Sequence, residues 1–177
     1  MTAPAAGRDS VHASAVLVGD RAVLIRGPSG SGKSRLAFDL ILAGRAGQIP
    51  AALLIGDDRV YLDIIQGRLV VRHARELAGL IEIRGLGIRR CDFAEQAIVG
   101  LVVDLAAANA ERLPSAGALM TNVYGAILPR IPVGPGFEPF PMVVAALTTT
   151  DAAAPTRPSD DCSKGIGNHI SPTIATE

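Results

Sequence analysis

Gly27-Pro28-Ser29-Gly30-Ser31-Gly32-Lys33-Ser34 is the stretch that decides the fold, because it fits G-x-x-x-x-G-K-[ST] at every fixed position. Residues 21–26 before it predict a buried strand. Residues 34–45 after it predict a helix, with one face formed by Leu36, Ala37, Leu40, Ile41 and Gly44. Glycines let backbone N–H groups turn inward around phosphate oxygens, and a helix N-terminus adds positive partial charge. The stretch therefore predicts a phosphate-binding P-loop, and a glycine-rich turn that binds nothing is the alternative.

Residues in the loop and in two later segments suggest the chemistry of the site. In a P-loop, Lys33 is expected to reach the outer phosphates of a nucleotide such as ATP, and the Ser34 hydroxyl to ligate Mg²⁺. Asp57 and Asp58 follow a wholly apolar strand at 51–55, of the kind buried on both faces, where nucleoside triphosphatases keep Mg²⁺-directed and catalytic carboxylates. An ordinary polar turn is the alternative for this pair. Residues 80–88 interleave one acid and one base with aliphatic residues, so these charges are expected to meet each other, a metal or a phosphate. A plain surface ion pair is the alternative for this stretch.

Composition narrows the class of protein. A length of 177 residues predicts one globular domain, and seventeen basic residues balance seventeen acidic ones, which argues against binding to nucleic acid or to an anionic membrane surface. Cys91 and Cys162 lie far apart without a C-x-x-C motif, so we expect two free thiols in a reducing compartment. Neither a signal peptide nor a run of 18 apolar residues is present. We therefore expect a cytoplasmic protein.

The remaining pattern predicts an α/β domain with a mixed sheet. One hairpin is expected at 14–26, with His12 at the start of its first strand. A second hairpin is expected at 59–72 and is followed by His73, which we expect to be a structural or solvated residue. We expect an irregular or helical piece at 91–96, a core strand at 97–105, few helical residues at 106–117, an edge strand at 127–132 and a short helix at 140–147. Residues 1–10 and 149–177 are expected to be a disordered leader and tail around a domain at 11–148.

These motifs resemble a known family. Val11-His12, the P-loop, Asp57-Asp58, Glu82-Ile83-Arg84-Gly85-Leu86-Gly87-Ile88 and Glu111-Arg112-Leu113 occur in the order seen in HPr kinase/phosphorylase, over about residues 10–148. The resemblance implies a P-loop kinase that phosphorylates a serine of HPr, the phosphocarrier of a phosphotransferase system, and that reverses the reaction with inorganic phosphate. It implies a fold similar to the nucleotide-binding core of phosphoenolpyruvate carboxykinase. It also implies ATP and Mg²⁺ as cofactors and a homohexamer.

The resemblance carries roles to matching positions. Asp58, supported by Asp57, would be the base that takes the serine proton, and Glu82 would join Ser34 on Mg²⁺ with Arg84 beside it. Arg112 would act on the transferring phosphoryl group, and His12 would lie near the phosphates. The acceptor is HPr or an HPr-like carrier, including one of a nitrogen-type phosphotransferase chain. The donor, ATP or pyrophosphate, is left open.

The chain also departs from the family pattern. Ala13 stands where the family has glycine, and Arg35 where a glutamate is common. The family loop Pro-Val-Arg-Pro-Gly-Arg, tied to dephosphorylation, reads Pro132-Val133-Gly134-Pro135-Gly136-Phe137, so two guanidinium groups that suit phosphate are missing. The segment before Asp57 is longer than usual, the segment before Arg112 is shorter, and the usual N-terminal domain is not seen. We therefore expect a kinase with reduced phosphorylase activity.

Two other classes of function remain open at this point. One is a P-loop kinase or nucleotidase that acts on a small molecule, because the loop handles the nucleotide and says nothing of the acceptor. The other is a nucleotide-binding regulator without turnover, against which Lys33, Ser34, Asp57, Asp58 and Glu82 argue.

Overall fold

The computed structural model describes residues 10–151, so the predictions for residues 1–9 and 152–177, Cys162 included, lie outside the described residues. Ten strands, two α-helices and one short 3₁₀ helix make up this part of the chain. They are β1 (Ala13–Val18), β2 (Arg21–Arg26), α1 (Lys33–Arg45), β3 (Ala52–Gly56), β4 (Val60–Ile65), β5 (Arg68–His73), η1 (Arg75–Leu77), β6 (Leu80–Ile83), β7 (Gly87–Arg90), β8 (Gln96–Leu105), β9 (Met120–Val123), β10 (Ala126–Val133) and α2 (Pro139–Thr148). None of the described helices is long and apolar enough to cross a membrane.

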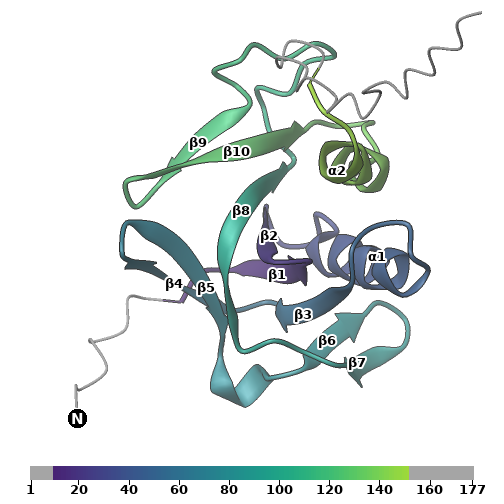
Figure 1. The fold of residues 1–177 in the computed structure, drawn as a ribbon. Helices are drawn as coiled ribbons and strands as arrows, with labels where there is room; N and C mark the ends of the chain where they lie inside the picture. The colour runs from purple at the N-terminus through teal and green to yellow at the C-terminus, as the bar shows by residue number, and fades with distance from the viewer. Residues whose placement is uncertain (1–9, 152–177) are drawn as a thin grey trace, which may run out of the picture.

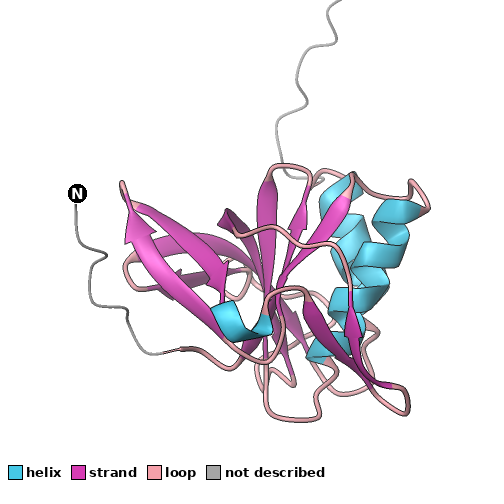
Figure 2. Ribbon diagram, turned by 90° about the horizontal axis from the view of Figure 1, so that it is seen from below, coloured by secondary structure: helices cyan, strands magenta, loops and turns pink. Residues whose placement is uncertain are grey.

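A mixed sheet organises the domain, as predicted. Its strand order is β3-β1-β2-β8-β10-β9, with β5 and then β4 attached at β8, and it contains eight strands in all. β8 lies parallel to both β2 and β10, whereas the other pairs of the sheet are antiparallel. The β6–β7 hairpin forms a separate two-stranded sheet beside α1 (Figure 1). Figure 2 shows α1 and α2 on one side of the sheet and the β4–β5 hairpin on the other.

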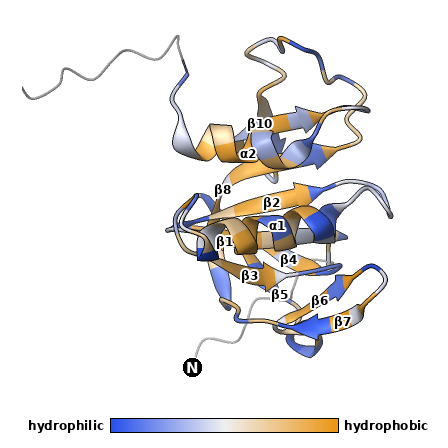
Figure 3. Ribbon diagram, turned by 90° about the vertical axis from the view of Figure 1, so that its right-hand side faces the viewer, coloured by the Kyte–Doolittle hydropathy of each residue, from blue (hydrophilic) through white to orange (hydrophobic). Residues whose placement is uncertain are grey.

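Each face of this sheet has its own hydrophobic core. Successive side chains of a strand point to opposite faces, so Val23 and Ile25 pack toward α1 while Ala22 and Leu24 pack toward β4 and β5. The predicted face of α1 is confirmed, since Leu36, Ala37, Leu40 and Ile41 are buried. A Cβ atom at Gly44 would lie 2.7 Å from Ala52, so glycine there lets the helix approach β3 closely. Figure 3 shows apolar residues along β2 and β8 and polar residues along β7.

Two strands are present as predicted, but their predicted positions in the sheet are wrong. The strand predicted at 51–55 is β3, which lies at the sheet edge and leaves Leu53 36% exposed, so it is not buried on both faces. The strand predicted as an edge at 127–132 is β10, which lies between β8 and β9. Its prolines are tolerated because Pro129 pairs only with β9 and Pro132 only with β8, so neither proline has to serve two neighbouring strands.

Candidate active site

The loop between β2 and α1 has the backbone shape that the motif requires. Gly30 and Gly32 have φ angles of 77° and 96°, in the left-handed region that favours glycine. A Cβ atom at Gly27 would lie 2.9 Å from the Cβ of Leu105, so only glycine fits beside the end of β8. Gly32 caps α1, and no side chain caps the first turn. The N–H groups at the start of α1 are therefore free to meet phosphate oxygens.

Lys33 is held inside this loop. Its side chain is 6% exposed, and Nζ donates to the backbone oxygens of Gly27 and Pro28, each at 3.0 Å. Nζ also lies 2.9 Å from Nε2 of His12. Burial lowers the pKa of Lys33, and the carboxylates of Asp57 and Asp58 oppose that shift. A cation confined in this way is ready to turn from backbone carbonyls to a phosphate.

His12 connects Lys33 to Asp58. Nδ1 of His12 lies 3.1 Å from the backbone oxygen of Asp58 and 3.1 Å from its carboxylate Oδ1. These contacts fit the tautomer with hydrogen on Nδ1, which leaves Nε2 to accept from Lys33. The Asp58 side chain is 68% exposed, and its φ of 64° lies in the left-handed region that aspartate tolerates better than most residues. Asp58 is thus an accessible carboxylate tied to the P-loop lysine through one imidazole.

Asp57 is a buried structural acceptor. It is 4% exposed, and its Oδ1 accepts a 2.6 Å hydrogen bond from the hydroxyl of Ser14, which is fully buried. Its Oδ2 accepts from the backbone N–H of Glu82 at 3.2 Å. Asp57 therefore joins β1, the end of β3 and β6 at one point. The sequence analysis missed Ser14, although a hydroxyl residue within an otherwise apolar strand was the available signal.

Most predicted site residues line one cavity of about 660 Å³. His12, Asp58, Glu82 and Arg84 lie on its wall together with residues 29–34 of the loop. Arg35, Phe38, Asp39 and Ile83, to which the sequence analysis gave no role, complete the lining. Burial raises the pKa of the Asp39 carboxyl, and Arg35, whose Nε lies 3.8 Å away, opposes that shift.

Glu82 and Arg84 do not pair with each other. Among residues 10–151 neither forms an ion pair, so the predicted alternative of a surface ion pair is not seen. Arg84 instead extends to the P-loop, where its Nη2 would lie 3.9 Å from a Cβ atom built on Gly30. The two charges of β6 and its turn therefore face the phosphate loop.

A second polar cluster lies at the end of β2 and was not predicted. Asp104 of β8 accepts from Arg26 at 2.7 and 2.8 Å and from Arg130 of β10. Arg130 also donates to Ala118 and Asn109, each at 3.1 Å, in the segment between β8 and β9. Burial by itself raises the pKa of Asp104, but the two guanidinium groups outweigh it and hold that pKa below its ordinary value. The cluster anchors the segment that follows β8 to the strand that leads into the P-loop.

Comparison with known proteins agrees with this geometry. A family model described as the HPr Serine kinase C-terminal domain matches residues 4–111. The chain belongs to this family. HPr kinase/phosphorylase of Mycoplasma mycoides is 42% identical over 77 residues, which are 44% of this chain and 22% of that protein. The enzyme of the same name from Pediococcus pentosaceus is 44% identical over 86 residues, 47% of this chain and 25% of that protein. The chain thus spans about a quarter of the length of these relatives.

A solved structure supports the fold. The HPr(Ser) kinase/phosphatase from Coxiella burnetii aligns with a TM-score of 0.63 at 22% identity, covering 78% of this chain and 87% of that one. The predicted family resemblance and the α/β class with a mixed sheet are confirmed. The residues around the cavity, His12 to Arg84, lie inside the part that the family model matches, whereas Arg112 and the altered loop at 132–137 lie beyond it.

Arg112 is one of the predicted site residues that do not line the cavity. It is exposed, lies between β8 and β9, and is absent from the cavity wall. Gly27, Pro28 and Asp57 also do not line the cavity, but Gly27 and Pro28 bind Lys33 and Asp57 binds Glu82. The role of Arg112 stays a prediction.

The donors around the cavity fit a Mg²⁺-bound polyphosphate of the kind expected in this family. No three His, Cys, Asp or Glu side chains within residues 10–151 cluster to hold a metal by themselves. Ser34 and Glu82 do line the same cavity, beside the uncapped start of α1. Mg²⁺ at phosphate-transfer sites is bound through one or two protein oxygens together with substrate phosphates, so a sparse donor set is the expected one.

Proposed function

We propose that the chain is an ATP- and Mg²⁺-dependent kinase that phosphorylates a serine of HPr or of an HPr-like carrier. One observation carries the proposal. Lys33, Asp58 and Glu82, which come from separate segments, line a single cavity beside the P-loop. Membership of the HPr Serine kinase C-terminal domain family supports the same reaction.

In this reaction residues 27–34 hold the phosphates of the nucleotide, and Lys33 exchanges its bonds to backbone oxygens for bonds to the outer phosphates. Ser34 and Glu82 would hold Mg²⁺, which would supply positive charge to the phosphate oxygens. Arg84 lies beside Gly30 and adds a fixed positive charge on the side of the β6–β7 hairpin. These residues orient the phosphoryl group and balance its charge, the main tasks in phosphoryl transfer.

Asp58 serves as the base toward the acceptor serine. It is the exposed member of the pair Asp57-Asp58, and the cavity wall includes Asp58 and not Asp57. His12 holds the Asp58 carboxylate at one oxygen and leaves the other free to accept the serine hydroxyl. Asp57 keeps Glu82 in place through its backbone N–H. Arg112 acts on the transferring group when the carrier is bound.

The reverse reaction, phosphorolysis of the phosphoserine, is weaker than in relatives with two arginines in the 132–137 loop. Gly134 and Phe137 stand at the positions of those arginines. A Cβ atom at Gly134 would lie 2.8 Å from the Cβ of Ala110, so the backbone here is packed against the segment after β8. Without the two guanidinium groups, inorganic phosphate has fewer bidentate donors.

The deciding experiment incubates the protein with γ-labelled ATP, Mg²⁺ and the HPr-like carrier encoded in the same genome. Label on a carrier serine is expected with the wild type. Asp58→Asn should lower the rate about 10²-fold or more, the range for a general base, while Asp20→Asn in the β1–β2 turn should leave it unchanged. An unlabelled carrier with the wild type would refute the proposal, and ATP turnover that continues without the carrier would favour a small-molecule kinase or nucleotidase. The homo-oligomer and the cytoplasmic location remain predictions.

A further inference from the structure

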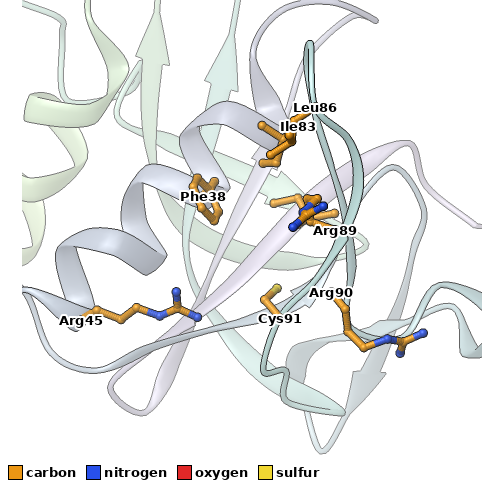
Figure 4. A pocket seen from close by; sticks show the side chains of 8 residues that line it. Phe38, Arg45, Ile83, Leu86, Arg89, Arg90 and Cys91 are labelled. Carbon is orange, nitrogen blue, oxygen red and sulfur yellow. The ribbon is translucent and has the colours of Figure 1, made fainter.

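A second cavity lies between α1 and the β6–β7 hairpin. Its volume is about 310 Å³, which is at the small end of ligand pockets. Phe38 of α1 and Ile83 of β6 form apolar walls, and Cys91 lies where β7 ends (Figure 4). Phe38 and Ile83 also line the phosphate cavity, so the two cavities are separated by a single layer of side chains.

Three arginines contribute to the lining of this apolar space. Arg45 comes from the last turn of α1, and Arg89 and Arg90 come from β7. Figure 4 shows Arg45 extending toward Cys91 and Arg89 extending into the space that faces Phe38, whereas Arg90 runs away from both. Within residues 10–151 none of the three forms an ion pair, and no hydrogen bond from their guanidinium groups is found. Two guanidinium groups thus lie beside an apolar lining without a carboxylate on either.

The chemistry of this cavity points to one kind of ligand. Guanidinium groups are weakly hydrated and bind carboxylate or phosphate oxygens through two parallel hydrogen bonds. The apolar walls exclude a ligand that is charged throughout, because its far side would lose water without finding a partner. We propose that this cavity binds a small organic anion, with its acidic group between Arg45 and Arg89 and its apolar body against Phe38 and Ile83.

Such a ligand would act on the phosphate cavity, and this step rests on the proposed kinase function. The β6–β7 hairpin is hydrogen-bonded as a separate two-stranded sheet, and it carries Glu82 and Arg84. α1 carries Lys33 and Ser34 at its other end. A ligand that fills the space between them braces the hairpin against the helix and fixes the distance between these two sets of residues. The cavity is therefore a regulatory site whose occupancy changes phosphoryl transfer.

Phenyl phosphate is a suitable probe, because it combines one phosphate group with one apolar ring. Its binding is measured by calorimetry on the full chain, with inorganic phosphate and benzyl alcohol as the two partial probes. Arg45→Gln and Arg89→Gln should each weaken phenyl phosphate binding about tenfold, whereas Arg68→Gln, an exposed arginine of β5, should not. Both tested arginines are exposed, so the variants are expected to have the same melting temperature as the wild type.

The P-loop also attracts phosphate, and Lys33→Ala separates the two sites. Binding at the second cavity should survive Lys33→Ala and be weakened about tenfold in Arg89→Gln. A second measurement uses Cys91, which lines the cavity. In a Cys162→Ser background, phenyl phosphate should slow alkylation of Cys91 by iodoacetamide, and Arg89→Gln should abolish that protection. Wild-type affinity for phenyl phosphate in both arginine variants, an affinity for inorganic phosphate equal to that for phenyl phosphate, or no protection of Cys91 would overturn the assignment.

The regulatory role is tested separately, by the rate of carrier phosphorylation. With active protein, phenyl phosphate should change kcat/KM for carrier phosphorylation, and Arg89→Gln should remove that change. Binding with Cys91 protection but an unchanged rate would overturn the regulatory role and leave the binding site standing. Because calorimetry and thiol protection need no turnover, a failure of the proposed kinase function is distinguishable from a failure of the site.

Discussion

Ser14→Ala tests whether the buried hydrogen bond to Asp57 holds the candidate site together. The hydroxyl of Ser14 is fully buried and donates at 2.6 Å to a carboxylate that is 4% exposed, so water does not replace it. A hydrogen bond to a charged group contributes about 1.5–3 kcal/mol. A loss of about 2 kcal/mol should lower the melting temperature of a chain of this size by roughly 4–8 °C. Thermal unfolding followed by circular dichroism measures this shift.

The same substitution should affect the use of Mg²⁺. Asp57 accepts the backbone N–H of Glu82, so a loosened Asp57 leaves Glu82 less well placed. We expect Ser14→Ala to need a several-fold higher Mg²⁺ concentration for half-maximal carrier phosphorylation. Ser14→Thr keeps the hydroxyl and should restore the wild-type Mg²⁺ dependence. A melting temperature and a Mg²⁺ requirement equal to those of the wild type in Ser14→Ala would refute the reasoning.

Further predictions concern Asp104 and the 132–137 loop. Asp104→Asn should lower the free energy of unfolding by about 2–4 kcal/mol, somewhat less than for a fully buried pair, because it leaves two guanidinium groups facing each other. Folding lowers the pKa of Asp104, so its contribution to the free energy of unfolding is complete above the ordinary pKa of 3.8 and is lost as pH falls through the lowered value. Urea titrations at a series of falling pH values should show this loss of stability in the wild type and not in Asp104→Asn. In the 132–137 loop, Phe137→Arg should raise phosphorolysis of phosphoserine-HPr, measured as pyrophosphate release, since Phe137 is 36% exposed. Gly134→Arg should instead destabilise the fold by about 1–3 kcal/mol against Ala110; a melting temperature equal to the wild type would show that this contact gives way.

Local patterns predicted the parts of the fold that depend on neighbouring residues. The strand, loop and helix at residues 21–45 follow from apolar spacing and from glycines that fix the turn. The β1–β2 and β4–β5 hairpins follow from alternating runs around short polar turns. In both hairpins the strand partner of a residue lies at most 13 positions away along the chain, so local spacing is enough to find it.

Contacts between distant segments were not predicted, and most errors come from there. β10 reads as an edge strand because it contains Pro129 and Pro132, but it is divided between two neighbours that spacing does not reveal. The bonds from Arg26 and Arg130 to Asp104 span 78 and 26 residues. The bond from Ser14 to Asp57 spans 43 residues. Each of these depends on which strands become neighbours, a property of the whole sheet.

The sequence motif does not distinguish the roles of Asp57 and Asp58. The sequence presents them as equivalent neighbours after a strand, yet one is 4% exposed and the other has a side chain that is 68% exposed. The difference arises at Asp58, whose φ of 64° turns the chain out of β3 directly after Asp57 enters the core. Asparagine adopts this conformation as readily as aspartate, so Asp58→Asn preserves the turn and removes the charge. A loss of phosphoryl transfer in that variant therefore reports on the carboxylate itself, whereas Asp58→Ala would also strain the backbone and report on both.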